Sequence, residues 1–264
     1  MGLEVKKIKV YVVGPYTSYA SWLNHTLVET MEEADLVLFT GGEDVDPALY
    51  KQAKGKFTSI DRNRDIDEVA EARLAMLLNK PIWGTCRGIQ LGCVLSGGSL
   101  VQHMNHPHMH NLTMYDGTTI QTNSLHHQLQ HHVGLHPTEY FVAAWAESLS
   151  NIYLNGTNNP VTLPSVTRGA KAYFKEPELV YYRKTNWLGI QGHPEMMNYS
   201  CRMNEILRAM VNLQIDGRLD LVLSLNIPVS RYVDAKLDIH DDELQAYESI
   251  LNLRQSIDSD LLTN

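Results

Sequence analysis

The sequence predicts an α/β fold in which helices cover both faces of a mostly parallel sheet. Two short apolar runs, KIKVYVVG (7–14) and ADLVLFTGG (34–42), have the length and composition of buried strands. A helical pattern (61–80), a third apolar run (81–85) and a second helical pattern (87–98) follow them. Alternating strands and helices of this kind form parallel sheets covered on both faces, with functional residues where the strands end.

The bulk properties are those of a globular protein that can bury a sizeable core. The chain has 264 residues, of which 44% are hydrophobic and 20% charged, and its formal net charge is −8. This negative charge argues against a protein that binds nucleic acid by neutralising phosphates. Apolar runs such as LVLF are too short for a membrane span, and the first residues lack a signal-peptide pattern. Three cysteines without framework spacing fit reduced thiols, so we expect a cytoplasmic location.

The segment 61–80 is the longest helical pattern in the first half of the chain. Its apolar residues recur at helical spacing with charged residues opposite, which predicts an amphipathic helix. These apolar positions are Ile66, Val69, Leu74, Leu77 and Leu78.

From residue 99 to 192 the pattern becomes more typical of strands. Asp116-Gly117 lies between two strand-like runs and predicts a hairpin, and residues 180–195 indicate two strands around the tripeptide KTN. Residues 200–214 are again amphipathic and helical.

We expect residues 1–215 to form one domain and residues 216–264 an acidic C-terminal extension. Within the extension, 241–258 has apolar residues on one helical face, and acidic residues at its start favour the helix N-terminus. Such a helix either packs against its own domain or docks on a partner subunit, and the sequence leaves both open.

Cys86 stands in the sequence Gly84-Thr85-Cys86-Arg87-Gly88, which has the form of a nucleophile elbow. A side chain exposed at a sharp strand-to-helix turn needs glycines beside it, because larger residues would collide with neighbouring strands. The N-terminus of the following helix favours a thiolate at this position. The alternative is a buried cysteine without a chemical role, which is what we expect of Cys93 and Cys201.

The segment GIQGHPE (189–195) offers a proton-transfer partner for such a thiolate. His193 and Glu195 are two residues apart, so in an extended segment their side chains point to the same side. The carboxylate can then orient the imidazole while its other nitrogen faces the sulfur.

Together, GTCRGIQ, GIQGHPE and FTGGEDVDPALY (39–50) resemble motifs of the class I glutamine amidotransferase superfamily, and most closely those of its γ-glutamyl hydrolase branch, which includes γ-glutamyl-γ-aminobutyrate hydrolases. Arg64-Asp65, GGSLVQ (97–102) and NSLHHQ (123–128) are further matches. The resemblance extends over roughly residues 8 to 200. It implies a three-layer, flavodoxin-like α/β fold with a nucleophile elbow, and makes residues 1–215 the catalytic domain.

The resemblance implies that Cys86 is the nucleophile, His193 the general base and then acid, and Glu195 the residue that orients it. The chemistry it implies is hydrolysis of glutamine or a γ-glutamylated amine through a γ-glutamyl thioester, without a metal or organic cofactor. The matching motifs place the backbone N–H groups of Gly42 and Arg87 in the oxyanion hole. They place Gln90, Ser124, His126 and His127 at the substrate.

Nine of the twelve histidines lie between residues 103 and 136. His106, His108 and His110 alternate like residues on one face of a strand, which would suit zinc. Since no carboxylate or cysteine follows at a familiar ligand spacing, we expect instead a polar strand and loop beside the substrate pocket, and no metal.

Three functions remain open on the sequence alone. The first is a free-standing hydrolase of a γ-glutamyl amide. The second is a glutaminase subunit that passes ammonia to a separate synthase, docked through the extension from residue 216, which could equally mediate a homo-oligomer. The third, an inactive binding module, is disfavoured because Cys86, His193 and Glu195 are all present.

Overall fold

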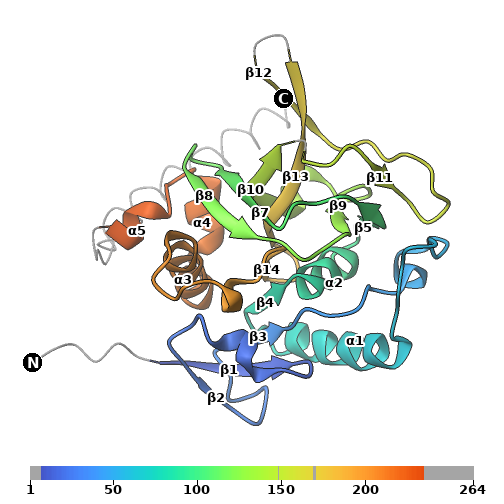
Figure 1. Ribbon diagram of the computed structural model, residues 1–264. Helices are drawn as coiled ribbons and strands as arrows, with labels where there is room; N and C mark the ends of the chain where they lie inside the picture. Colours follow the sequence, from blue (N-terminus) through green and yellow to red (C-terminus); the bar gives the residue numbers. More distant parts are fainter. Residues whose placement is uncertain (1–6, 148, 169–170, 235–264) are drawn as a thin grey trace, which may run out of the picture. The chain divides into compact units, whose positions relative to one another are not determined.

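The computed structural model describes residues 7–147, 149–168 and 171–234 (Figure 1). The chain divides into two compact units, Met1–Ile227 and Pro228–Asn264, and each is described by itself. In the second unit the described part contains helix α5 (Ser230–Asp234). The helix predicted for 241–258 lies outside the described residues, so the role of the acidic extension stays a prediction.

A ten-stranded sheet forms the centre of the first unit, with the order β2-β1-β3-β4-β14-β13-β10-β7-β8 and β12 paired with β13. The strands from β2 to β14 in this order are parallel, and the strands beyond β14 pair antiparallel. A mostly parallel sheet is thus confirmed for the N-terminal half of the chain. The sheet consists of β1 (Ile8–Val13), β2 (His25–Leu27), β3 (Leu36–Phe39), β4 (Ile82–Thr85), β7 (Met109–Met114), β8 (Thr119–Asn123), β10 (Tyr140–Glu147), β12 (Ser165–Arg168), β13 (Lys171–Tyr182) and β14 (Trp187–Ile190).

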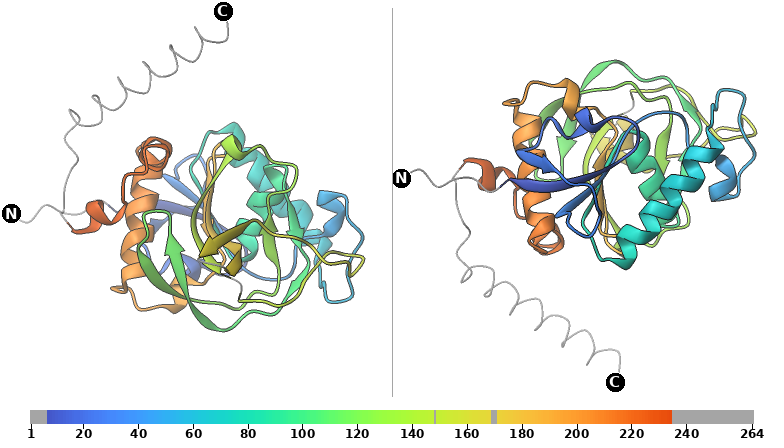
Figure 2. Two further views of the ribbon diagram at one scale, coloured as in Figure 1. Left: turned by 90° about the horizontal axis from the view of Figure 1, so that it is seen from above. Right: turned by 90° about the horizontal axis from the view of Figure 1, so that it is seen from below.

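Helices α1 (Arg62–Leu77) and α2 (Arg87–Leu95) cover one face of this sheet, and α3 (Arg202–Ile215) and α4 (Leu219–Ser224) cover the other (Figure 2). The predicted three-layer α/β fold is therefore confirmed. Two pairs of short strands lie outside the main sheet, and 3-10 turns connect several elements. These are β5 (Ser99–Val101) with β9 (Leu129–His131), β6 (His103–Met104) with β11 (Tyr153–Leu154), and the turns η1 (Thr17–Ala20), η2 (Pro47–Tyr50), η3 (Pro137–Glu139) and η4 (Pro194–Met196).

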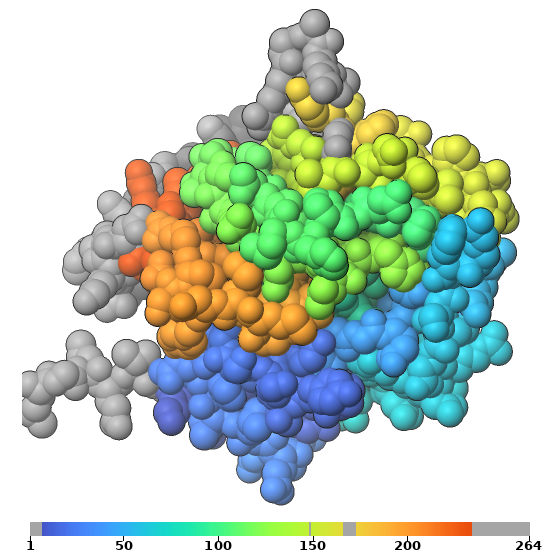
Figure 3. All heavy atoms as spheres, viewed as in Figure 1, coloured from blue at the N-terminus to red at the C-terminus, as the bar shows by residue number. Residues whose placement is uncertain are grey.

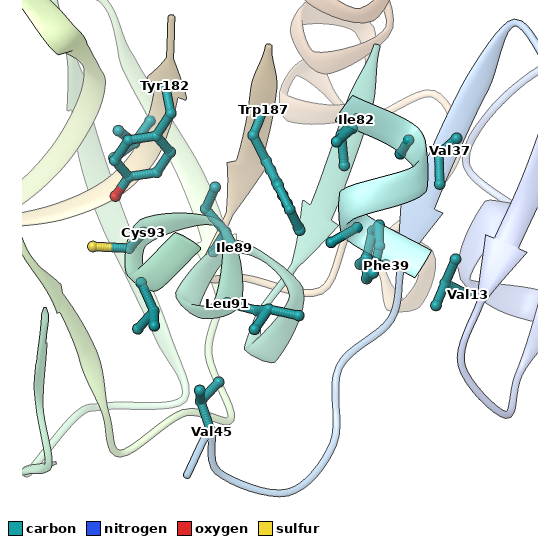
Figure 4. Packing of buried hydrophobic residues seen from close by; sticks show 14 of the residues in the cluster. Val13, Val37, Phe39, Val45, Ile82, Ile89, Leu91, Cys93, Tyr182 and Trp187 are labelled. Atoms are coloured by element: carbon teal, nitrogen blue, oxygen red, sulfur yellow. The ribbon is translucent and has the colours of Figure 1, made fainter. Parts of the chain in front are cut away.

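The core between α2 and the sheet holds the start of α2 in place. Ile89 and Leu91 of α2 are fully buried, as are Phe39 of β3 and Trp187 of β14, whose ring centres lie 4.7 Å apart (Figure 4). Burying side chains of this size contributes about 1.5–3 kcal/mol each. None of the described helices is both long and apolar enough to cross a membrane.

Helix α1 packs on the sheet with a different face from the predicted one. Of the predicted apolar positions only Val69 is partly buried, whereas Ile66 is 67% and Leu77 83% exposed. The buried positions are Asp65, Glu68, Ala72 and Ala75. The prediction was wrong because two carboxylates turn inward to pair with the buried guanidinium of Arg87, and apolar spacing does not reveal such a pairing.

Candidate active site

Cys86 lies at the sharp turn between β4 and α2. Its backbone angles, φ +52° and ψ −107°, are in a region that residues with a side chain rarely adopt, which marks a strained position. A Cβ atom on Gly88 would lie 2.4 Å from the carbonyl oxygen of Phe39 in β3, and one on Gly84 would lie 2.5 Å from the backbone of Gly88. Both glycines are therefore required by close packing, Gly88 against a strand as predicted and Gly84 against the start of α2.

The segment after β14 passes beside this turn. The parallel register pairs Ile190 with Thr85, and the backbone N–H of Cys86 donates to the carbonyl of Ile190 over 2.8 Å. His193 is the N-cap residue of η4, and Glu195 lies within η4. The two side chains are therefore brought together by a short 3-10 turn, whereas we expected an extended segment.

His193, Cys86 and Glu195 form a connected group. The Nδ1 atom of His193 lies 2.7 Å from Oε1 of Glu195, and Cys86 lies near enough to the imidazole to affect its pKa. Burial lowers the pKa of His193, but the hydrogen bonds and charges of Cys86 and Glu195 outweigh it and raise that pKa to about 10. A thiol, an imidazole and a carboxylate in this order can perform nucleophilic acyl transfer.

Asn123, at the end of β8, fixes the backbone of His193. Its Oδ1 accepts a hydrogen bond from the N–H of His193 over 2.7 Å, and its Nδ2 donates to the carbonyl of His193 over 2.9 Å. In the space-filling view, the green surface of the β7–β8 hairpin adjoins the orange surface around α3 (Figure 3). The sequence does not reveal this role of Asn123, because nothing in the local pattern links it to a residue 70 positions later.

Tyr19 of η1 is a second residue of the site that the sequence pattern does not reveal. Its ring centre lies 6.0 Å from that of His193. Burial and the nearby charges of Glu195 and Cys86 raise the pKa of Tyr19 to about 12, so its hydroxyl stays protonated at neutral pH. It therefore gives the site a neutral group that can donate a hydrogen bond.

The loop after β3 carries Gly41 and Gly42 beside the site. The carbonyl of Gly41 accepts a hydrogen bond of 2.7 Å from Nη2 of Arg64, which also pairs with Glu43 over 2.8 Å. The described part of the chain contains no cis peptide bonds, so the N–H of Gly42 points away from Arg64. Gly42 has φ +144°, and a Cβ atom there would lie 1.9 Å from the guanidinium of Arg64.

The side chain of Arg87 connects the start of α2 to α1. It is fully buried and pairs with Asp65 over 2.6 Å and with Glu68. Glu68 in turn accepts from Arg64 over 2.6 Å, and Asp65 accepts from the N–H of Asp46 over 3.0 Å. One charged network thus holds the turn of Cys86, helix α1 and the loops that follow β3.

A cavity of about 150 Å³ opens at Cys86. Gln90, His126 and His127 line this cavity. The side chain of Gln90 donates a hydrogen bond to the carbonyl of Gln128 over 3.2 Å. The remaining lining residues are Gly42, Glu43, Asp44, Ser59, Leu125 and Gln128.

The two neighbouring histidines have different surroundings. The side chain of His127 is 41% exposed, and its Nε2 lies 3.2 Å from Oδ1 of Asp44, whose carboxylate raises the pKa of His127. His126 is buried and directs its Nε2 toward Glu178 of β13, away from Asp44. Ser124 is buried but is not among the residues that line the cavity.

A larger cavity of about 710 Å³ also borders the Gly41–Gly42 loop. It shares Gly42 and Glu43 with the first cavity but not Cys86, and its lining includes three acidic residues of α1. We place the candidate chemistry in the smaller cavity, because that is where the Cys86 thiol lies.

The three thiols differ in their surroundings, which leads to a first prediction. Burial raises the pKa of Cys93 to about 12, and Cys201 caps α3, where it is half-buried and not in the core as expected. We expect Cys86 to react with a small alkylating reagent at neutral pH at least tenfold faster than either, because His193 can accept its proton. Peptide mass spectrometry over time would measure the three rates, and equal rates would contradict this expectation.

Comparison with known proteins finds similarity to one protein family and to several individual proteins. Residues 18–148 match the profile of the Peptidase C26 family. The glutamine amidotransferase-like protein YvdE of Lactococcus lactis subsp. lactis is 29% identical over 167 residues, which are 61% of this chain and 66% of that protein. Its homologue in Lactococcus lactis subsp. cremoris is 42% identical over 72 residues, or 27% and 38% of the two chains. The chain thus spans less than two thirds of the length of both relatives.

A glutamine amidotransferase of Thermotoga maritima aligns with a TM-score of 0.46 and 12% identity, covering 95% of this chain and 98% of that one. Over the matched segments, the chain is similar to the Peptidase C26 family and to glutamine amidotransferase-like proteins.

Proposed function

We propose that this protein hydrolyses a γ-glutamyl amide, either glutamine or a γ-glutamylated amine, through a thioester on Cys86. One observation carries the proposal. The strained turn presents the thiol of Cys86 to a small polar cavity and places it near the imidazole of His193, which lies 2.7 Å from Glu195. The names of the relatives, as glutamine amidotransferase-like proteins, support the same chemistry.

In the proposed reaction the sulfur of Cys86 attacks the γ-carbonyl carbon, and the carbonyl oxygen becomes an oxyanion. The backbone N–H groups of Gly42 and Arg87 would stabilise it, the latter because the first N–H of α2 has no acceptor within its own helix. The imidazolium of His193 gives its proton to the leaving amine. Water then attacks the thioester, His193 takes the proton of that water, and glutamate leaves.

We assign substrate contact to Gln90 and His127, which line the cavity. His126 also lines the cavity, but its Nε2 faces Glu178, so we assign it to the cavity wall, and Ser124 stays a proposed contact of the segment that leads into it. The carboxylate of Asp44, also in the cavity wall, is suited to pair with the α-amino group of a glutamyl substrate.

The test is release of glutamate from L-glutamine and from a panel of γ-glutamyl amines by the purified chain. We expect turnover in the wild type and in the matched control Cys201→Ala, and none above background in Cys86→Ala. Activity that survives in Cys86→Ala would overturn the proposal. So would the absence of Cys86-dependent glutamate release from every compound, combined with no labelling of Cys86 by an electrophilic glutamine analogue.

Labelling of Cys86 without turnover would favour the glutaminase-subunit alternative, in which a synthase partner completes the site. Ammonia measurement after adding candidate partners would then follow. The γ-glutamyl hydrolase assignment, the cytoplasmic location and any partner or homo-oligomer formed through the extension from residue 216 stay predictions.

A further inference from the structure

A second cluster of polar side chains lies behind the wall of the cavity. Three histidines converge on two glutamates of β13. One of these histidines precedes β7, one lies within β7 and one precedes β9. Their side chains are at most 3% exposed. The members are His106, His110, His126, Glu176 and Glu178.

The imidazole nitrogens gather around the carboxylate of Glu178. Its Oε1 lies 3.1 Å from Nε2 of His106, 3.4 Å from Nε2 of His126 and 3.5 Å from Nε2 of His110. The other glutamate, Glu176, places Oε2 3.4 Å from Nε2 of His106. Despite these approaches, none of these five atoms has a hydrogen-bond partner in the part of the chain that the structure describes.

The contacts of the second ring nitrogen, Nδ1, explain why the Nε2 atoms have no hydrogen-bond partner. Nδ1 of His126 lies 2.9 Å from the carbonyl of Gln128, and Nδ1 of His106 lies 3.2 Å from the carbonyl of Pro107. A carbonyl only accepts, so each Nδ1 carries the hydrogen and the Nε2 of a neutral ring presents a lone pair. Lone pairs from two rings then face the lone pairs of a carboxylate, and only a cation between them makes this arrangement favourable.

The charge of the cluster leads to the same conclusion. Glu176 and Glu178 are two residues apart on one strand and fully buried. Ser150 and Tyr153 satisfy Oε1 of Glu176, but no lysine or arginine among the described residues pairs with either glutamate. Two uncompensated buried carboxylates are costly, and one divalent cation neutralises both.

We propose that His106, His126 and Glu178 bind a divalent transition-metal ion of the zinc type. These three side chains each offer one ligand atom, and the atoms lie within 4.8 Å of one another. Tetrahedral zinc with bonds of 2.0–2.1 Å separates its ligand atoms by about 3.3–3.4 Å, which matches the 3.1 and 3.4 Å between Glu178 and the two histidines. Glu176 Oε2 or His110 is placed to supply the fourth ligand.

Such a site would be structural and not catalytic. Its candidate ligands all come from the protein and are buried, whereas a catalytic zinc keeps an open position for water. The ion would tie β13 to the segments that contain His106 and His126, and the latter lines the cavity at Cys86. The sequence-based expectation of no metal failed to consider Glu178, which lies 52 residues after His126 in the chain.

The alternative occupant of the cluster is a proton. Burial lowers the pKa of His106, but the two carboxylates outweigh it and raise that pKa to about 9, so an imidazolium could replace the metal. The test must therefore measure the metal itself.

The full chain is stripped with a chelator, shown by circular dichroism to be folded, and titrated with Zn²⁺ against a chromophoric competitor. We expect one ion per chain, an affinity at least 100-fold weaker in Glu178→Gln and in His126→Gln, and no change in His108→Ala. His108 is the matched control, because it lies between His106 and His110 in the sequence but is exposed.

Two further measurements use the wild-type protein, so they do not depend on whether the variants fold. Wild-type protein loaded with Co²⁺ should show the intense visible bands of four-coordinate cobalt with nitrogen and oxygen ligands, and Zn²⁺ should raise the melting temperature of the stripped wild type. Absence of stoichiometric binding, or binding that is equally strong in Glu178→Gln, would overturn the proposal. None of these readouts depends on glutamine hydrolysis, so failure of the proposed function would leave the metal site to be judged separately.

Discussion

Replacing Glu195 by Gln should lower kcat for the proposed hydrolysis on the order of a thousandfold. The carboxylate accepts from Nδ1 of His193 over 2.7 Å, and both side chains are buried, so the interaction is only weakly screened by solvent. A glutamine amide can present a donor to that nitrogen and stabilise the wrong tautomer of the imidazole, which disables the proton transfer. The fold should be unaffected, because Gln has nearly the same shape.

The pH profile separates loss of orientation from a general structural defect. With the pKa of His193 raised to about 10, we expect the wild-type rate to decline at alkaline pH only near pH 10, where the imidazolium that protonates the leaving amine is lost. Removing the charge of Glu195 takes away one cause of the raised pKa, so the decline should begin at lower pH in Glu195→Gln.

Glu205→Gln is the matched control, because Glu205 is a half-exposed residue of α3 that pairs with Arg202. It should leave both the rate and the profile unchanged. A Glu195→Gln protein with near-normal kcat and an unshifted alkaline limb would contradict the orienting role.

The sequence was sufficient to predict the parts of this site that lie close together in the chain. The glycines around Cys86, and the closeness of His193 and Glu195, follow from steric requirements and short spacing that a single sequence displays, although a 3-10 turn and not an extended segment brings the pair together. The parallel half of the sheet followed equally from the alternation of strands and helices.

The parts that depend on contacts between distant segments could not be predicted in this way. Asn123 reaches His193 only because β8 and the end of β14 meet in space. The carboxylates of the histidine cluster belong to β13, far from the histidines in the sequence. Asp65 of helix α1 points inward because it forms an ion pair with the buried Arg87. Hydrophobic periodicity indicates which apolar residues are buried. It does not reveal a buried charged residue whose ion-pair partner lies in a distant segment of the chain.

Replacing Arg87 by Met should destabilise the protein by about 3–5 kcal/mol, because it leaves the buried carboxylate of Asp65 without its counter-charge and leaves Glu68 paired with Arg64 alone. Arg62→Met is the matched control on α1. The side chain of Arg62 is 75% exposed and pairs with Asp46, so its loss should change the free energy of unfolding by less than about 1 kcal/mol. Urea denaturation monitored by circular dichroism measures both.

The pH dependence of this loss identifies its cause. Burial raises the pKa of Asp65 above its ordinary value, although the charge of Arg87 opposes the shift. Without Arg87 that pKa should rise further, and the folded variant can then relieve the buried charge by taking up a proton. A carboxyl whose pKa is raised in the folded state destabilises the protein more as the pH rises toward that pKa. The loss of unfolding free energy in Arg87→Met should therefore be smaller at pH 5 than at pH 7.5. A deficit independent of pH would indicate lost packing, and a deficit no larger than that of Arg62→Met would show that this network does not stabilise the turn that carries Cys86.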